Sequence, residues 1–161
     1  MTVDTRTPSG RIHFHEGSIV LPASFEDRTT NIFVPADITS NPNLSIARDW
    51  LVEGESLSTY IDRQLAQLKG RMPGHKLLSR QTEQLGQGDV LVGERIDASY
   101  KNNGRHVHQR QAAFLIAPLR ALILTAASPK SFDDAFHALW REWLDGYRPA
   151  KADDLPQPAA D

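Results

Sequence analysis

Four histidines could bind a metal ion, because they form two His-x-His pairs. The pairs are His13 with His15 and His106 with His108. Alternate side chains of a strand project from one face, so each pair could chelate a metal. The alternative is that each pair lies on a partly solvated strand, beside charged side chains such as Arg11. Short motif matches often mislead, so we favour the second interpretation and expect no metal or other cofactor.

The motifs of common catalytic and nucleotide-binding sites are absent. The sequence contains no G-x-G-x-x-G, G-x-x-x-x-G-K-[ST], G-x-S-x-G or H-E-x-x-H. Asp133 and Asp134 are adjacent, so they would not face each other as an acid–base pair. At the start of a helix they suit N-terminal capping and the positive end of the helix dipole. We therefore expect a protein that is not an enzyme.

Three glutamines have positions that suit contact with a partner. Gln64 lies at the margin of the apolar stripe of a predicted helix, and Gln109 and Gln111 share one face of a predicted strand. A neutral amide both donates and accepts hydrogen bonds, and its burial costs less free energy than that of a charge. The alternative for each is a solvated surface glutamine.

Arg48 stands between Ile46 and Trp50 in an alternating pattern. Alternation predicts an inward arginine that pairs with a carboxylate or with carbonyl oxygens at the end of the sheet. We expect a structural ion pair there rather than a catalytic group.

Length, charge and hydropathy narrow the class of protein. A chain of 161 residues fits one domain, and 18 Lys and Arg against 20 Asp and Glu leave it nearly neutral. Duplex nucleic acid is an unsuitable partner for such a chain, because phosphate binding needs clustered cations. The absence of cysteine excludes disulfides and thiolate metal sites.

The distribution of apolar residues bears on location. The N-terminus lacks the apolar run of a signal peptide. The longest uncharged apolar stretch, Ala121 to Ser128, is far shorter than the roughly 20 residues that span a bilayer. We expect a cytoplasmic protein that does not insert into the membrane itself.

Strand patterns dominate the chain, and two amphipathic helices interrupt them. Predicted strands cover residues 11–16, 18–21, 29–34, 44–50, 76–84, 89–100, 105–116 and 119–127. Gly17 is expected to form the first hairpin turn, and Asn103-Gly104 a later one.

The first predicted helix, residues 57–72, begins after Ser56, and the second, residues 131–146, begins with a capping box at Ser131. This order predicts an α+β fold, an antiparallel sheet packed with helices. Flexible tails, residues 1–10 and 149–161, are expected to flank a domain of residues 11–148.

Several short segments, in order and spacing, resemble the DcrB-like family. They are Leu21-Pro22, Phe25 to Phe33, Ser45 to Asp49, Tyr60 to Leu65, Met72 to Leu77 and Arg110-Gln111. More narrowly, the chain resembles the effector-associated gene (Eag) chaperones of bacterial type VI secretion. The resemblance runs from about Phe14 to Tyr147 and implies a PsbP-like α+β fold.

Eag chaperones are cytosolic dimers that bind hydrophobic transmembrane segments near the N-terminus of PAAR-containing effectors. They shield these segments until the effector is loaded on the VgrG spike. The resemblance therefore implies a homodimer with a PAAR effector as its partner. The alternatives are a DcrB-like accessory or binding domain with another partner, whose relatives typically carry a signal or lipoprotein sequence, and a metal or small-ligand binder.

The resemblance also implies a partner-binding groove. Matched motif by motif, its positions are Thr30, Ile32, Ser45, Gln64, Leu68, Met72 and Gln111. The family tends to place apolar residues where this chain has Thr30 and Ser45, so the strand side of the groove is expected to be more polar. Leu68 and Met72 lie within the apolar stripe of the helix, where core packing is the alternative.

Overall fold

The computed structural model describes residues 11–150 and contains two compact units. The described residues 11–29 and 148–150 belong to one unit, and Thr30–Tyr147 form the other. The first unit carries a hairpin of β1 (Arg11–Phe14) and β2 (Gly17–Val20). The prediction that Gly17 forms the turn is wrong. Gly17 pairs with Phe14 and is the first residue of the second strand. The predicted tail 1–10 and residues 151–161 lie outside the described residues.

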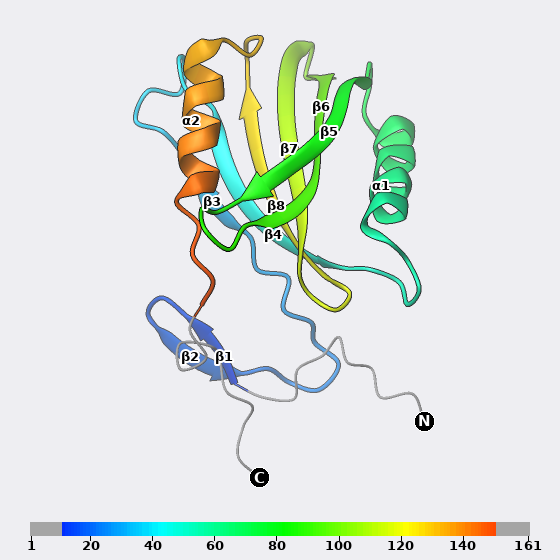
Figure 1. Cartoon of the computed structure of the whole chain (residues 1–161), viewed down its shortest axis with the longest axis vertical. Helices are drawn as coiled ribbons and strands as arrows, with labels where there is room; N and C mark the ends of the chain where they lie inside the picture. Colours follow the sequence, from blue (N-terminus) through cyan, green and yellow to red (C-terminus); the bar gives the residue numbers. More distant parts are fainter. Residues whose placement is uncertain (1–10, 151–161) are drawn as a thin grey trace. The chain divides into compact units, whose positions relative to one another are not determined.

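The second unit is built on a six-stranded antiparallel sheet (Figure 1). Its order is β3-β4-β8-β7-β6-β5. The strands are β3 (Asn31–Phe33), β4 (Asn43–Trp50), β5 (Lys76–Leu85), β6 (Leu91–Asn102), β7 (Arg105–Ala117) and β8 (Arg120–Ser128). Asn103 and Gly104 join β6 to β7 with φ values of 52° and 77°, the positive angles that a tight hairpin turn requires. The predicted α+β fold is confirmed.

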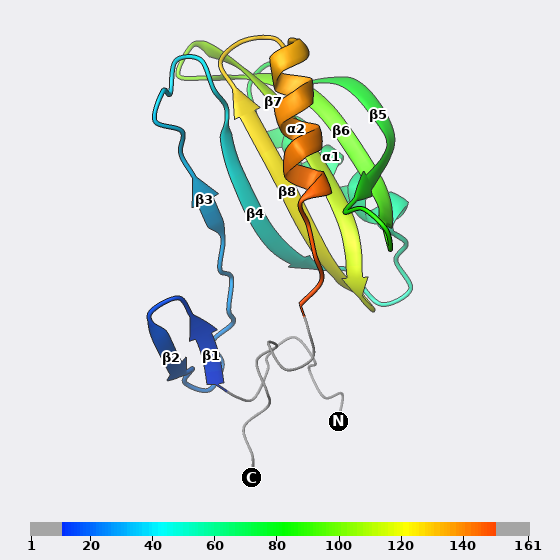
Figure 2. The same cartoon turned by 60° about the vertical axis from the view of Figure 1, so that its left-hand side comes forward.

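Two helices, α1 (Leu57–Arg71) and α2 (Asp134–Asp145), cover opposite faces of this sheet (Figures 1 and 2). Ser56 caps α1 by accepting a hydrogen bond from the backbone N–H of Thr59, as predicted. The predicted start of α2 at Ser131 is wrong. The carboxylate of Asp133 caps this helix at 2.8 Å from the N–H of Phe136. The residue before it, Phe132, stacks on Phe136, which directs the chain into the helix at Asp133.

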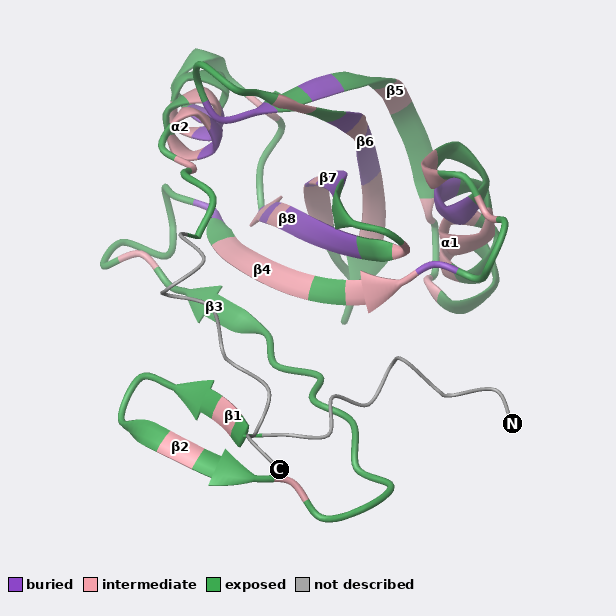
Figure 3. Cartoon of the chain, turned by 60° about the horizontal axis from the view of Figure 1, so that its bottom comes forward, coloured by how far each residue is buried: buried purple, intermediate pink, exposed green. Residues whose placement is uncertain are grey.

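Each face of the sheet buries its own apolar core (Figure 3). On the α2 face, Phe136, Trp140 and Leu144 recur at helical spacing and are buried. They pack on strand residues Leu85, Ala112, Phe114, Leu122, Leu124 and Ala126. On the α1 face, the buried residues are Leu51, Tyr60, Ile61, Ile96, Ala113, Ala121 and Ile123.

A buried ion pair on the α2 face joins β6 to β7. Arg110, 3% exposed, donates to both carboxylate oxygens of Asp97, at 2.8 and 2.9 Å. Its guanidinium carbon lies 5.1 to 5.6 Å from the ring centres of Phe132, Phe136 and Trp140. This contact supplies cation–π attraction in a desolvated site. The pair therefore anchors the aromatic side of α2 to the sheet.

A second buried carboxylate, Glu83 on β5, binds side chains from the C-terminal half of α2 to the sheet. It accepts hydrogen bonds from the indole of Trp140 at 2.9 Å and from Arg141 at 2.7 Å, and Arg95 lies 3.1 Å away. Burial alone would raise the pKa of Glu83. Hydrogen bonds from Trp140, the backbone N–H of Gln84 and Arg141 outweigh this effect and hold the pKa below its ordinary value.

We predict that Asp97→Ala lowers the free energy of unfolding by about 3–5 kcal/mol, because it leaves the buried charge of Arg110 unpaired. A urea titration followed by circular dichroism measures the change. Lys130→Ala is the control, since it breaks a half-exposed pair with Asp133 at 3.6 Å and should have a much smaller effect. Equal effects of the two substitutions would contradict the anchoring role of Asp97.

We also predict that Glu83 makes the fold sensitive to acid. Because its pKa is lowered in the folded state, its contribution to stability is full above the unfolded pKa and is lost as the pH falls through the folded pKa. Glu83→Gln should therefore destabilise the protein most near pH 7, and the difference from wild type should shrink towards about pH 3. Unfolding titrations at several pH values measure it. A difference that stays constant with pH would refute this role.

Candidate functional site

The α1 face of the sheet is only partly covered. Among the described elements, α1 packs mainly on β6 and β7. Ala121 and Ile123 of β8 are buried with α1, but over β3 and over the ends of β4 and β8 that carry Ser45 and Thr125 no described helix of Thr30–Tyr147 packs as closely on this face. Ile32 on β3 is 67% exposed, and Ser45 and Thr125 are half-buried. This part of the sheet therefore offers an open surface beside α1.

One row of side chains crosses the sheet on this face. From strand to strand, the directly opposed residues are Ile32, Ser45, Thr125, Gln111 and Ile96. Directly opposed residues project from the same face of a sheet. Ile96 belongs to the core under α1, so the whole row faces α1. The fold thus brings three residues of the predicted groove, Ile32, Ser45 and Gln111, into one line.

Gln64 on α1 and Gln111 on β7 line the same cavity, which has a volume of about 160 Å³ and is called the Gln64 cavity below. Its other lining residues are Ala47, Arg48, Asp49, Tyr60, Ile61, Glu94, Ile96, Ala113 and Ile123. The amide nitrogen of Gln111 donates to the hydroxyl of Thr125 at 3.3 Å. Two amides therefore meet a mainly apolar hollow between helix and sheet.

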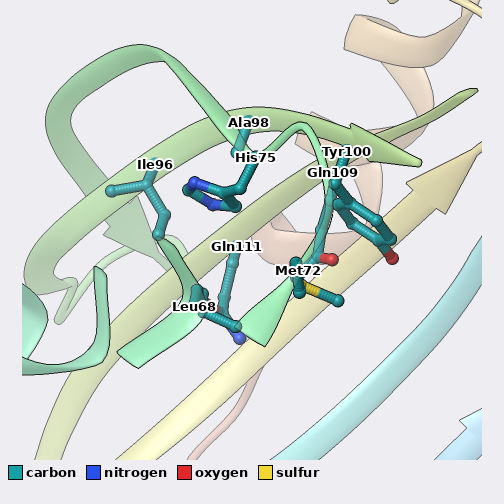
Figure 4. Close-up of a pocket in the computed structure, with 8 residues that line it drawn as sticks. All are labelled: Leu68, Met72, His75, Ile96, Ala98, Tyr100, Gln109 and Gln111. Carbon is teal, nitrogen blue, oxygen red and sulfur yellow. The ribbon is translucent and has the colours of Figure 1, made fainter. Parts of the chain in front are cut away.

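Leu68 and Met72, near the end of α1, line a neighbouring hollow of about 10 Å³ (Figure 4). Its remaining lining residues are His75, Ile96, Ala98, Tyr100, Gln109 and Gln111. This volume is about the least that a single water needs, so the side chains of the protein already fill the space. Ile96 and Gln111 line both hollows, so the two are adjacent along the sheet.

Among the predicted groove residues, Thr30 lies apart from the row of side chains and from both hollows. It lies one residue before β3, is exposed and lines neither hollow. Ser45 lies within the row, between Ile32 and Thr125. The strand side of the site is therefore mixed in character, with an exposed isoleucine beside two hydroxyl side chains.

The part played by Tyr60, Asp49 and Thr125 could not be predicted from the sequence. The hydroxyl of Tyr60 donates to Asp49 at 2.8 Å at one end of the Gln64 cavity. Burial and this carboxylate raise the pKa of Tyr60 far above its ordinary value, so the phenol stays protonated. Thr125 joins the site only through the strand register, which the sequence does not reveal.

The predicted inward position of Arg48 is wrong. Its side chain is exposed and donates to the side-chain oxygen of Asn31 and to the carbonyl of Ile46. Asn31, the first residue of β3, pairs with Ile46, so β3 offers no strand neighbour opposite Arg48. The arginine consequently lies at the edge of the sheet.

The two histidine pairs are divided between the two units. His13 is in β1 and His15 follows it in the turn, whereas His106 and His108 are in β7. Within residues 11–150, no group of three or more His, Cys, Asp or Glu side chains could hold a metal ion. His108 instead contacts the ring of Phe132 edge-on.

We predict that Gln64→Leu combined with Gln111→Leu changes the free energy of unfolding by less than about 1 kcal/mol. Of these two glutamines, only Gln111 has a side-chain hydrogen bond to another described residue. Its partner Thr125 is half-buried and accessible to water. Thermal and urea unfolding measure the change. A loss several times larger would mean that the amides hold the fold together and are not free to bind a partner.

Comparison with known proteins agrees with this architecture. The family model described as DcrB matches residues 16–146. A protein of unknown function from Pseudomonas aeruginosa, PA94, is 22% identical, with a TM-score of 0.66 over 88% of this chain and 97% of its own. LpqN of Mycobacterium tuberculosis, involved in cell envelope biogenesis, is 17% identical, with a TM-score of 0.48 over 75% of this chain and 82% of its own. No curated protein matches the sequence.

The length and apolar content of the helices bear on whether they could span a bilayer. Neither helix within residues 11–150 is both long enough and apolar enough to cross a membrane.

Proposed function

Because the chain belongs to the DcrB family, we propose that it acts by binding, as a chaperone for the N-terminal transmembrane segments of a PAAR-containing type VI secretion effector. It holds these segments until the effector is loaded on the VgrG spike. The resemblance to Eag chaperones in the segments from Leu21-Pro22 to Arg110-Gln111 supplies the identity of the partner. A cytoplasmic location, a homodimer and the lack of catalytic activity are parts of the same proposal.

The open α1 face of the sheet is the observation that carries this proposal. An apolar helix of roughly 20 residues aggregates in water unless a carrier supplies apolar area against which it can pack. Ile32 is exposed, and Ile96 and Ile123 form the floor beside α1. A helix lying over β3, β4 and β8 would complete the cover that α1 begins.

Small side chains on this face support the close approach of such a helix. Ser45 and Ala47 on β4 and Thr125 and Ala127 on β8 are all half-buried. Packing between membrane helices likewise relies on Gly, Ala, Ser and Thr, which let the backbones come close together. The hydroxyl side chain of Ser45, where the family tends to be apolar, is therefore compatible with a helical client.

The amides of Gln64 and Gln111 support the polar part of the recognition. Hydrogen bonds between membrane helices contribute on the order of 0.6 to 2 kcal/mol each. Both amides border a mainly apolar hollow and add no further charge to it. They can therefore replace the polar contacts that the client segment would make inside the bilayer.

We predict that a PAAR effector with N-terminal apolar segments is insoluble alone and co-purifies with this protein. Gln64→Leu combined with Gln111→Leu should weaken the complex about tenfold or more, because two hydrogen bonds to the client are lost. Titration of labelled effector by fluorescence anisotropy measures the affinity.

The matched control is Gln67→Leu combined with Gln84→Leu, two exposed glutamines that line neither hollow. This control should bind as the wild type does. The binding mode is wrong if deletion of the apolar segments leaves the complex intact, or if the two double variants bind equally well.

A further inference from the structure

We propose that the Gln64 cavity is a socket for one uncharged, hydrogen-bond-donating side chain of the bound apolar helix, and that Glu94 is its acceptor. Serine, threonine and asparagine are the side chains of this class. The inference rests on the proposed function, because it names the feature of the client that the site recognises.

The volume of the cavity is the first observation. At about 160 Å³ it has far more space than the neighbouring hollow of about 10 Å³, which the protein itself fills. A single water needs only about 10–15 Å³ measured in this way. Its apolar walls include Ala47, Ile61 and Ile123. The cavity therefore has room for a side chain that enters from the open face.

The position of Glu94 is the second observation. Ala47, Ile123, Ala113 and Glu94 are directly opposed across β4, β8, β7 and β6. This row lies one pleat along the sheet from the row that contains Gln111, so it projects from the same face. Glu94 and Asp49 are the carboxylates of the lining, and both oxygens of Asp49 already accept hydrogen bonds, from the backbone N–H of Trp50 and the hydroxyl of Tyr60.

The hydrogen bonding of Glu94 leaves one oxygen available. Oε1 accepts from Nε of Arg80 at 3.0 Å, whereas no donor within residues 11–150 is hydrogen-bonded to Oε2. The Glu94 side chain is 24% exposed, so it is partly shielded from water. A carboxylate oxygen in such a place favours a donor, and hydrogen bonds to charged groups are stronger than those between neutral groups.

Arg80 holds Glu94 in place. The same guanidinium donates to the carboxylate of Asp62 and to the carbonyl and hydroxyl oxygens of Ser58, both on α1. The acceptor is thus tied to the helix that forms one wall of the cavity. A fixed acceptor loses little conformational entropy when a donor binds.

The charges around the cavity favour an uncharged donor. Glu94 is already paired with Arg80, and Asp49 already accepts from the hydroxyl of Tyr60. A lysine of the client would pay the desolvation penalty of a buried charge. A hydroxyl or amide donor carries no such penalty.

A threonine scan of an apolar client helix tests the proposal. Synthetic 20-residue apolar helices with Lys-flanked ends carry one Thr, or its isostere Val, at each of seven consecutive central positions, which together cover about two turns. Binding to the full chain is measured by fluorescence in mild detergent. At one position, or at two positions a turn apart, Thr should bind about tenfold more tightly than Val.

The chaperone variants identify the acceptor. In Glu94→Met the Thr-to-Val ratio should fall to about one, while the Val helix keeps its affinity within about twofold. Glu53→Met is the matched control, because Glu53 is an exposed glutamate that lines neither hollow, and it should keep the preference for Thr. Glu94→Gln, which keeps the size but removes the charge, should give an intermediate ratio and serves if Glu94→Met does not fold.

The outcomes separate the two proposals. If the apolar helices bind but Thr is nowhere preferred, or if the preference survives in Glu94→Met, the socket is wrong and the chaperone proposal stands. A Lys helix that binds more tightly than the Thr helix overturns the choice of an uncharged donor. If none of the apolar helices binds, both proposals fail.

Discussion

The ion pair between Asp97 and Arg110 is the interaction on which the arrangement of the sheet depends. These residues are direct register partners on β6 and β7, and they are joined by two hydrogen bonds. Ile96 and Gln111, next to them in the sequence, are also partners and project from the opposite face. A slip of one residue would break the buried pair and turn Gln111 away from α1. The same pairing that fixes α2 on one face therefore places the amide on the other.

The two faces of the sheet differ in a way that suits a carrier of apolar segments. On the α2 face, Asp97 pairs with the buried Arg110, Glu83 pairs with the half-buried Arg95, and aromatic side chains close the core. On the α1 face, Tyr60 and Ile61 bury one end of the helix, whereas the sheet beyond Gln111 stays open. The buried ion pair of Asp97 with Arg110 and the larger of the two apolar cores thus lie on the α2 face. A binding face can then remain incomplete without unfolding the domain.

Periodicity and turn chemistry predicted the helices and strands well. They failed for residues whose position depends on contacts between segments far apart in the sequence. The apolar stripe and Ser56 located α1, and Asn103-Gly104 located the longest hairpin, because these signals are local in sequence. The glutamine positions followed from alternation and from the family resemblance. The roles of Thr125 and Glu94 could not be predicted, since they follow from register between strands far apart in the sequence. Glu83 accepts a hydrogen bond from Trp140, which is 57 residues away in the sequence, and no local pattern predicts such a contact.

The central claim is that the α1 face, and not the α2 face, holds the apolar segment of an effector. Site-specific photo-cross-linking tests it most directly, with a benzophenone side chain at Ser45 on the α1 face or at Gln81 on the other. Gln81 is exposed and accepts a hydrogen bond from Arg95 in the network beneath α2. The account predicts cross-links from position 45 to the N-terminal apolar segments of the effector and none from position 81. Equal cross-linking from both positions, or cross-linking from position 81 alone, would contradict it.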